Sequence, residues 1–237
     1  MSFPRQRFVL DTTAFTDSKL LEQFGGTISD VVIRLTELIS IGRLRLNISC
    51  YMPPSTFKEL KEFLLENKCS LRDVDQVEAW VVRKTPDRYS VMLSSHVIYE
   101  YVSDVRKRLD QGMSIVRKAI KEALKYCEKN IFEDNHSKNI KDIEHSLTRN
   151  FEEKYRQKMR RGVLDSLPDI DTLILAKELN AGVVSADSGI KAWAERMGIR
   201  FVEASFFPQI ILTYLERLED FPEALKDYYK LQRNNSQ

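Results

Sequence analysis

Acidic side chains stand at positions in this sequence where parallel strands are expected to end. Asp11 follows the first apolar run of the chain, and Asp187 follows the apolar run 182–185. Asp169 lies at the start of an expected helix, and Glu59 lies early in the helix that follows another expected strand. The carboxyl ends of parallel strands meet at one edge of a sheet, where ligands bind. We therefore expect these four carboxylates to converge.

Carboxylates brought together in this way are suited to binding divalent cations. They repel one another, and their pKa values rise unless cations neutralise them. A ligand set made of oxygen, without Cys or His, favours Mg²⁺ or Mn²⁺ over Zn²⁺. Metal-activated water that attacks a phosphodiester is the natural use of such a site. We expect Asp11, Asp169 and Asp187 to hold the metal ions, with Asp165 and Asp171 completing the shell.

Each carboxylate except Asp11 also has a purely structural explanation. Asp169 and Asp187 can cap the helices that follow them, because Asp at an N-cap accepts hydrogen bonds from free backbone amides. The stretch from Thr56 to Glu59 matches a capping box, in which Glu59 would serve only the helix. Asp11 has no compelling capping role, so it is the residue that most favours a site.

The two flanks of the chain show the alternation of strands and helices that is typical of a parallel α/β sheet. Short apolar runs predict strands at residues 7–10, 44–50, 182–185 and 199–202. Helical spacing predicts helices at 31–39, with Gly42 as the stop, and at 56–66, 170–180 and 189–197. We expect one domain formed by residues 1–82 and 161–237, with residues 83–160 inserted.

The insertion has a different character from its flanks. Its pattern is mostly helical, with a polar turn at 130–139 between two long helices, which predicts a helical hairpin; a plain coiled arm is the alternative. Residues 83–161 contain 19 Lys and Arg against 12 Asp and Glu, although the whole chain has a net charge of only +2. A basic segment between acidic flanks suggests a polyanion partner.

Five cations lie in eight residues where the insertion meets the second flank: Lys154, Arg156, Lys158, Arg160 and Arg161. A solvated helix face is the usual meaning of such a run. Asp and Glu are absent from it, however, so we expect contacts with the phosphate backbone of a nucleic acid.

Other classes of protein are excluded by missing patterns. The 237 residues are 43% hydrophobic and include three scattered cysteines, which form neither a disulfide framework nor a zinc pattern. No GxGxxG, GxxxxGK[ST] or GxSxG motif occurs, and Thr13 occupies the position of the second Asp that a haloacid dehalogenase-type phosphatase requires. No apolar run spans a bilayer and no signal peptide is visible, which predicts a soluble cytoplasmic protein without a membrane partner.

The acidic motifs resemble those of a known family. The run VLDTTAF around Asp11, a mid-chain Glu59, and the stretches LDSLPDIDTLILAKEL and GVVSADSGI that contain Asp165, Asp169 and Asp187 are similar to the PIN nuclease domain. Together with a basic helical insertion, they resemble HARP, the small protein-only RNase P family, also called RNA ligase partner protein. The resemblance covers nearly the whole chain.

The resemblance to HARP implies removal of the 5′ leader from precursor tRNA without an RNA subunit, by two-metal hydrolysis that leaves a 5′-phosphate. It implies a homo-oligomer assembled through the helical arm. Asp11, Asp165, Asp169 and Asp187 match the acidic positions of the family; Asp171 and Glu59 match less closely, since Asp165 or Glu62 could serve instead. The alternatives are a toxin-like or rRNA-processing PIN nuclease and a non-catalytic RNA-binding partner of a ligase.

The end of the chain carries an apolar stripe without an obvious chemical role. Ile210, Ile211, Tyr214, Leu215 and Leu218 share a helix face, and a second helix is expected from Phe221 onward. Packing against its own domain and contact with another subunit both explain this pattern.

Overall fold

The computed structural model describes residues 5–132, 140–160, 164 and 166–217. The chain divides into two compact units: an α/β unit made of Met1–Met92 and Leu164–Gln237, and an arm unit, Leu93–Val163. The sequence analysis put the first boundary at residue 83, but the segment after it belongs to the α/β unit. Lys84 forms an ion pair with Glu178 at 2.9 Å, which ties this segment to the α/β unit.

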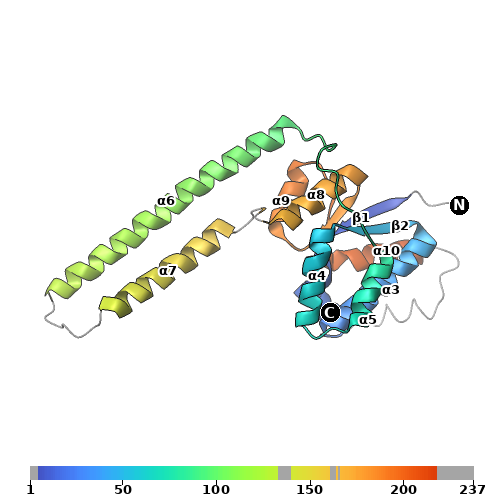
Figure 1. The fold of residues 1–237 in the computed structure, drawn as a ribbon, viewed down its shortest axis with the longest axis horizontal. Coiled ribbons are helices and arrows are strands. Elements are labelled where there is room, and N and C mark those ends of the chain that lie inside the picture. The colour runs from blue at the N-terminus through green and yellow to red at the C-terminus, as the bar shows by residue number, and fades with distance from the viewer. Residues whose placement is uncertain (1–4, 133–139, 161–163, 165, 218–237) are drawn as a thin grey trace. The chain divides into compact units, whose positions relative to one another are not determined.

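A five-stranded sheet lies at the centre of the α/β unit (Figure 1). Its strands are β1 (Gln6–Leu10), β2 (Ile48–Met52), β3 (Val81–Arg83), β4 (Gly182–Ser185) and β5 (Phe201–Glu203). The order is β3-β2-β1-β4-β5, and every pair is parallel. The predicted α/β class with a parallel sheet is confirmed. Successive strands extend to one side of β1 and then to the other, which places a topological switch point at the carboxyl end of β1.

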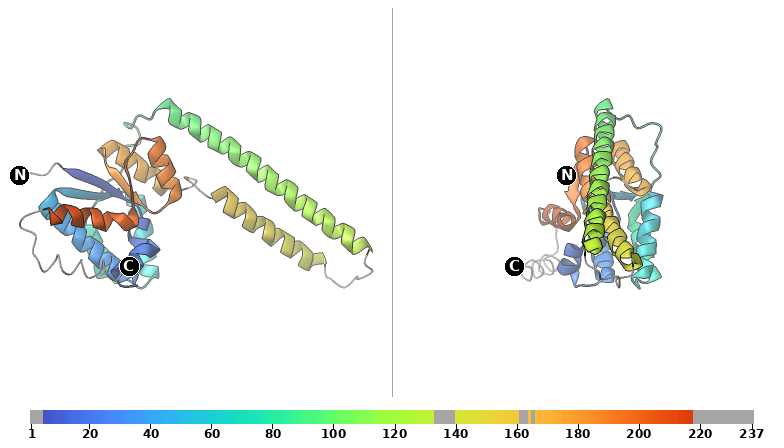
Figure 2. Two further views of the ribbon diagram at one scale, coloured as in Figure 1. Left: turned by 180° about the vertical axis from the view of Figure 1, so that it is seen from behind. Right: turned by 90° about the vertical axis from the view of Figure 1, so that its left-hand side faces the viewer.

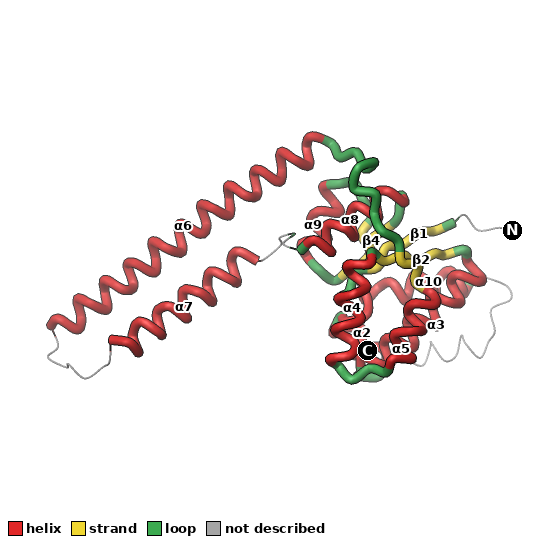
Figure 3. The backbone as a smooth tube through the Cα atoms, viewed as in Figure 1, coloured by secondary structure: helices red, strands yellow, loops and turns green. Residues whose placement is uncertain are grey.

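Helices cover both faces of the sheet (Figures 1 and 3). One layer contains α3, α5 and α10, and the opposite layer contains α8 and α9. The helices of this unit are α1 (Thr13–Thr16), α2 (Ser18–Phe24), α3 (Ile28–Leu46), α4 (Pro54–Glu66), α5 (Leu71–Trp80), α8 (Leu167–Leu179), α9 (Ser188–Arg196) and α10 (Phe207–Glu216), with a 3₁₀ turn, η1 (Ala204–Phe206), before α10.

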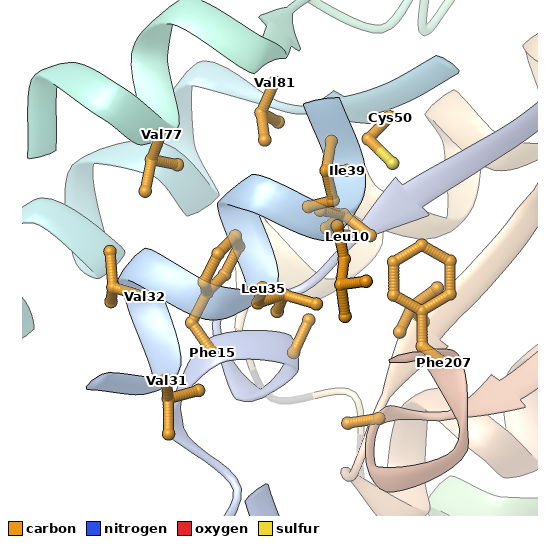
Figure 4. Packing of buried hydrophobic residues seen from close by; sticks show 14 of the residues in the cluster. Leu10, Phe15, Val31, Val32, Leu35, Ile39, Cys50, Val77, Val81 and Phe207 are labelled. Carbon is orange, nitrogen blue, oxygen red and sulfur yellow. The ribbon is translucent and has the colours of Figure 1, made fainter. Parts of the chain in front are cut away.

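The main core lies between the sheet and α3. Leu35 and Ile39 of this helix face Leu10 of β1 and Cys50 of β2, and Phe207 of α10 closes the cluster (Figure 4). All five are almost fully buried. Burying side chains of this size contributes about 1.5–3 kcal/mol each, so this layer fixes the position of β1 and of the residue that follows it.

Two predictions about β2 and its neighbours are wrong. We expected α3 to stop at Gly42 and a strand to begin at residue 44, but α3 continues to Leu46 and ends where Asn47 adopts a left-handed conformation with φ 55°. Gly42 lies inside the helix, where an added Cβ would lie 3.4 Å and 3.7 Å from the side chains of Ile211 and Ile48, within ordinary van der Waals contact. Strand β3, only three residues long, was not predicted.

Elsewhere, the helices predicted from apolar spacing are present, but some of them begin or end at other residues than predicted. Helix α4 begins at Pro54, two residues before the prediction, because Pro is suited to the first turn of a helix. Gly198, with φ +64°, follows α9 as expected. In α10, Ile211 and Leu215 are fully buried against the α/β unit, which confirms packing within the same domain for this part of the apolar stripe. Leu218 and the helix predicted from Phe221 lie outside the described residues.

The arm unit is a helical hairpin, as predicted (Figure 2). It consists of α6 (Ser95–Phe132) and α7 (Ile140–Arg160), which pack side by side. Gly112 of α6 faces the side chains of Tyr155 and Met159 of α7, and Arg108 donates a hydrogen bond to the Met159 carbonyl at 2.9 Å. The first residues of the predicted turn at 130–139 belong to α6; the rest lie outside the described residues. None of the described helices combines the length and apolar character needed to cross a bilayer.

Candidate active site

Asp11 is a buried carboxylate held at the carboxyl end of the central strand. Its backbone N–H donates to the Val184 carbonyl at 3.0 Å, which continues the pairing of β1 with β4. Its Oδ2 accepts hydrogen bonds from the hydroxyls of Thr13 at 2.7 Å and Ser185 at 2.9 Å, and a longer one from the Thr13 N–H at 3.3 Å. All three bonds go to the same oxygen, and among the described residues Oδ1 has no hydrogen-bond partner.

The two hydroxyls connect Asp11 to the start of α9. Thr13 Oγ1 accepts from the Ala186 N–H at 2.8 Å, and Ser185 Oγ accepts from the Asp187 N–H at 2.9 Å. Each hydroxyl therefore accepts from the backbone after β4 and gives its proton to Asp11. The backbone of Asp187 lies two hydrogen bonds away from the Asp11 carboxylate.

Asp187 is the N-cap of α9, so the capping explanation is correct for one of its oxygens. Oδ1 accepts from the N–H groups of Gly189 at 2.6 Å and Ile190 at 2.9 Å. Within the described part of the chain, Oδ2 has no such partner, and the side chain is exposed to solvent. Asp11 and Asp187 thus each have one oxygen bonded to the fold and one without a hydrogen-bond partner among the described residues, at the ends of neighbouring strands.

Asp169 is not the cap of α8, contrary to one explanation of its position. The N-cap is Ser166, whose hydroxyl accepts from the Asp169 N–H at 3.1 Å. Burial raises the pKa of Asp169 to about 7; a side-chain hydrogen bond with Ser166 opposes this shift, and repulsion from Asp11, Asp187 and Glu59 adds to it. These three carboxylates are therefore close enough to Asp169 to affect its charge.

Glu59 lies on the second turn of α4 and is exposed as a whole. Partial burial of its carboxyl, together with repulsion from Asp11 and Glu62, raises its pKa. The capping box that the sequence suggested for Glu59 does not form. Thr56, the expected cap, lies inside α4 with its hydroxyl 3.1 Å from that of Thr172. Glu59 is therefore available to the carboxylate cluster.

Asp165 lies outside the described residues. Asp171 contacts Arg88 and Ser55 rather than the other carboxylates. The buried Asp171 carboxylate forms a two-pronged ion pair with Arg88, from Nε to Oδ1 at 2.9 Å and from the terminal nitrogen to Oδ2 at 2.8 Å. Ser55 also donates to Oδ2 at 2.8 Å. Because both oxygens are engaged, the structure does not place Asp171 with the other carboxylates, and the prediction that it completes a metal shell is not supported.

The donor set fits a hard divalent cation. Among the described residues, no three His, Cys, Asp or Glu side chains lie in a ready-made metal site. Mg²⁺, however, keeps several waters and uses one or two carboxylates, so it does not need a closed protein cage. Such an ion can bind the oxygens of Asp11 and Asp187 that have no described partner. It would also stabilise the charged form of Asp169, which burial and the neighbouring carboxylates disfavour.

Sequence reasoning missed the hydroxyls of this edge. Thr13 and Ser185 were not assigned a role, although each lies two residues from an acidic candidate. The Thr12 hydroxyl, next to Asp11, is buried and finds no partner in the described part of the structure. A buried hydroxyl without a partner is costly, so a water or substrate oxygen bound here would satisfy it.

Two cations of the basic run in the arm form ion pairs with carboxylates that lie outside the run. Lys154 pairs with Glu122 of α6 at 3.2 Å, and Arg156 pairs with Glu152 at 3.4 Å. The absence of Asp and Glu from the run therefore does not prevent pairing within the helix, because Glu152 lies just before it. Both pairs are exposed, and such pairs are worth about 1 kcal/mol or less. Lys154 and Lys158 line a cavity of about 610 Å³ between α6 and α7. Lys118 and Phe151 line the same cavity.

Comparison with known proteins agrees with this site. Residues 7–216 match the family of PINc domain ribonucleases. The chain is 43% identical over 227 residues to the RNA-free ribonuclease P of Methanothermobacter thermautotrophicus, covering 91% of this chain and 99% of that protein. It is 44% identical over 221 residues to the RNA-free ribonuclease P of Methanopyrus kandleri (91% and 96%), and 43% identical over 214 residues to that of Archaeoglobus fulgidus (90% and 92%).

The parallel sheet, the carboxylates at its switch point and the match to PINc domain ribonucleases define a PIN-domain endoribonuclease. PIN-domain nucleases generally use divalent metal ions. The similarity to the archaeal proteins extends over nearly the whole chain, arm included. The chain belongs to the RNA-free ribonuclease P (HARP) family, as the sequence motifs predicted.

Proposed function

We propose that this chain is a protein-only ribonuclease P that hydrolyses precursor tRNA at the junction of the 5′ leader and the mature tRNA, leaving a 5′-phosphate. Membership of the HARP family supports the activity. The main structural support for the site comes from Asp11 and Asp187. In each carboxylate one oxygen is bonded to the fold and the other has no hydrogen-bond partner among the described residues. The substrate and the product ends are the parts of the proposal that need an experiment.

In the proposed mechanism, Asp11, Asp169 and Asp187 hold Mg²⁺ or Mn²⁺. When bound, such ions lower the pKa of an attacking water and stabilise the negative charge on the leaving 3′-oxygen. The chain's own part is positioning. Thr13 and Ser185 fix the Asp11 carboxylate, and the α9 amides fix Asp187, so that neither has to reorganise when substrate binds.

The remaining candidates take supporting roles in this proposal. Glu59 adds negative charge beside Asp11 and would orient the attacking water. Asp165 stays a candidate ligand from the family resemblance. Asp171 is a positioning residue that fixes α8 through Arg88, rather than a ligand.

The direct test combines a substrate assay with a conservative variant. Purified chain is incubated with a leader-bearing tRNA and Mg²⁺, and the product ends are mapped. Asp187→Asn is expected to abolish cleavage while RNA binding survives, because Asn remains a good N-cap and preserves α9. Asp75→Asn, at an exposed position on α5, is the control and should cleave normally. Cleavage by Asp187→Asn at the normal rate would contradict the assignment.

We also propose that the arm holds the tRNA through its phosphate backbone. The basic run Lys154, Arg156, Lys158, Arg160 and Arg161 supports this role. Lys118 and Phe151 extend it, since both line the cavity that contains Lys154 and Lys158. The exposed ion pairs of Lys154 and Arg156 are weak enough for phosphates to displace the carboxylates. Recognition of tRNA shape, rather than of base sequence, is the expected mode.

Self-association through the arm is the last part of the proposal. Helix α6 carries an apolar stripe that α7 does not cover, at spacings of three and four residues. Its members are Val105, Leu109, Met113, Val116, Ile120 and Leu124, and all are exposed. Monomers rarely leave a continuous apolar face in water, which supports a second copy of the chain as its partner.

A further inference from the structure

A basic pocket lies at the edge of the sheet opposite the carboxylates. It has a volume of about 480 Å³ and is formed where β1, β4 and β5 begin and where α8 and α9 end. Four cationic side chains line it: Arg5, Arg7, Lys177 and Arg200. None of its described lining residues is acidic. No part of the nuclease mechanism above uses this pocket.

Each of the four cations has a local partner, and Arg5 donates a hydrogen bond to the Tyr51 hydroxyl at 3.0 Å. Arg7 donates to the Leu179 carbonyl at the end of α8 at 3.0 Å, and Lys177 donates to the Met197 carbonyl after α9 at 2.8 Å. Cations at helix carboxyl ends offset the helix dipole, which amounts to about half a negative charge per helix. Two helix ends thus offset about one unit of the four positive charges, and a large positive excess remains.

Arg200 is held in a fixed orientation. Its guanidinium carbon lies 4.7 Å from the centre of the Phe8 ring, and two of its nitrogens lie 3.3 Å from Oε1 of Gln6. The opposite side is Gly182, where an added Cβ would lie 2.8 Å from Arg200 Nε. Any larger residue at 182 would displace this guanidinium. A planar donor group that is oriented before binding is suited to phosphate oxygens.

We propose that this pocket binds a backbone phosphate of the substrate RNA, away from the point of cleavage. This inference rests on the proposed function for the identity of the ligand, whereas the affinity of the pocket for phosphate does not depend on it. Strand β1 has five residues and spans about 16 Å, which corresponds to about five nucleotides of one strand. A structured RNA is longer than this distance, so one molecule can span both edges of the sheet.

The first experiment measures the pocket alone. Inorganic tripolyphosphate is titrated calorimetrically into the full-length protein and into Arg5→Gln/Arg200→Gln, with Arg72→Gln as a control that removes an exposed arginine of α5 outside the pocket. The double variant should bind about tenfold more weakly or worse, since two charge-assisted contacts are lost. Equal affinity in both proteins would overturn the proposal. Circular dichroism checks that all three proteins are folded.

The second experiment asks whether the phosphate belongs to RNA. Binding of leader-bearing tRNA is measured from 50 to 200 mM salt, and cleavage is followed at saturating enzyme. The double variant should bind more weakly, with a slope of log affinity against log salt that is smaller by about 1, while the cleavage rate at saturation stays unchanged. An unchanged salt slope would contradict the proposal that the bound phosphate belongs to RNA. Failure of the unmodified protein to cleave, with the salt effect present, would contradict the proposed function and leave the pocket standing.

Discussion

The hydroxyls of Thr13 and Ser185 are small groups on which the position of the Asp11 carboxylate depends. Thr13→Ala removes one hydrogen bond to Asp11 and leaves the Ala186 N–H without its acceptor. We expect the rate of precursor cleavage to fall about tenfold, with little change in RNA affinity, since one such bond is worth about 1–1.5 kcal/mol.

Thr13→Ser tests the same contact with the hydroxyl kept. It should retain most of the activity under single-turnover conditions. If Thr13→Ser lost as much activity as Thr13→Ala, the methyl group and its packing would be the important feature, and the hydrogen bond would not.

The pKa of Asp169 makes stability depend on pH and on divalent ions. Its value of about 7 in the folded protein lies above the ordinary 3.8, so the folded state holds a proton that the unfolded chain releases. The contribution of this group is greatest below about pH 4 and is lost as the pH rises through 7. Mg²⁺ offsets the repulsion among charged carboxylates, so it should raise the melting temperature more at pH 8 than at pH 5.

Asp169→Asn isolates this contribution from those of other groups. In EDTA, its melting temperature should rise relative to the original protein as the pH is raised from 5 to 8, and the extra stabilisation by Mg²⁺ at pH 8 should shrink. Asp75→Asn serves as the comparison for a carboxylate outside the cluster. A difference between Asp169→Asn and the original protein that stays constant over this pH range would contradict the assignment.

At the scale of elements, the ion pair between Arg88 and Asp171 fastens the segment before the arm to α8. Arg88→Ala leaves a buried carboxylate with Ser55 as its remaining described partner. Removing one partner of a fully buried pair costs 3–5 kcal/mol, and Arg88 is itself partly exposed, so we expect a loss of about 2 kcal/mol in the free energy of unfolding.

A double-mutant cycle by urea denaturation checks this prediction. Arg88→Ala/Asp171→Asn should lose less than the sum of the two single variants, because no unpaired charge then stays buried. Strict additivity would show that the pair is not coupled. Cleavage should fall only indirectly, since neither residue contacts the proposed ligands.

The sequence predicted those elements whose pattern is local. Strands β1 and β4 are apolar runs ending in Asp, so the class of fold and the edge that carries Asp11 and Asp187 were accessible. Strand β3 was missed because three residues are too few to show a period. Gly42 was misread because glycine often ends a helix, whereas α3 ends where Asn47 adopts the left-handed conformation. The pairing of Asp171 with Arg88 joins residues 83 positions apart and leaves no local signal.

At the scale of the whole molecule, the arm is expected to carry both RNA binding and self-association. Arg156→Ala/Arg160→Ala should weaken RNA binding and reduce its salt slope by about 1–2, with about 0.9 lost per phosphate contact. Arg149→Ala, on the same helix outside the basic run, is the matched control. Affinity that stays unchanged across a salt titration would refute this role.

The apolar stripe of α6 is tested separately by the mass of the assembly. Leu109→Glu/Val116→Glu places two charges in the stripe and should convert an oligomer into smaller species, as measured by light scattering. Ser103→Glu adds a charge at an exposed position outside the stripe and should leave the mass unchanged. The same mass for all three proteins would remove the stripe from the interface.

The adjacency of β1 and β4 also has a consequence during synthesis. Asp11 and Ser185 are 174 residues apart but share a hydrogen bond, so the nascent chain holds its first acidic group long before the partner strand leaves the ribosome. Until then the proposed site lacks both Ser185 and Asp187. We therefore expect a prematurely terminated polypeptide that ends before β4 to show no cleavage of precursor tRNA.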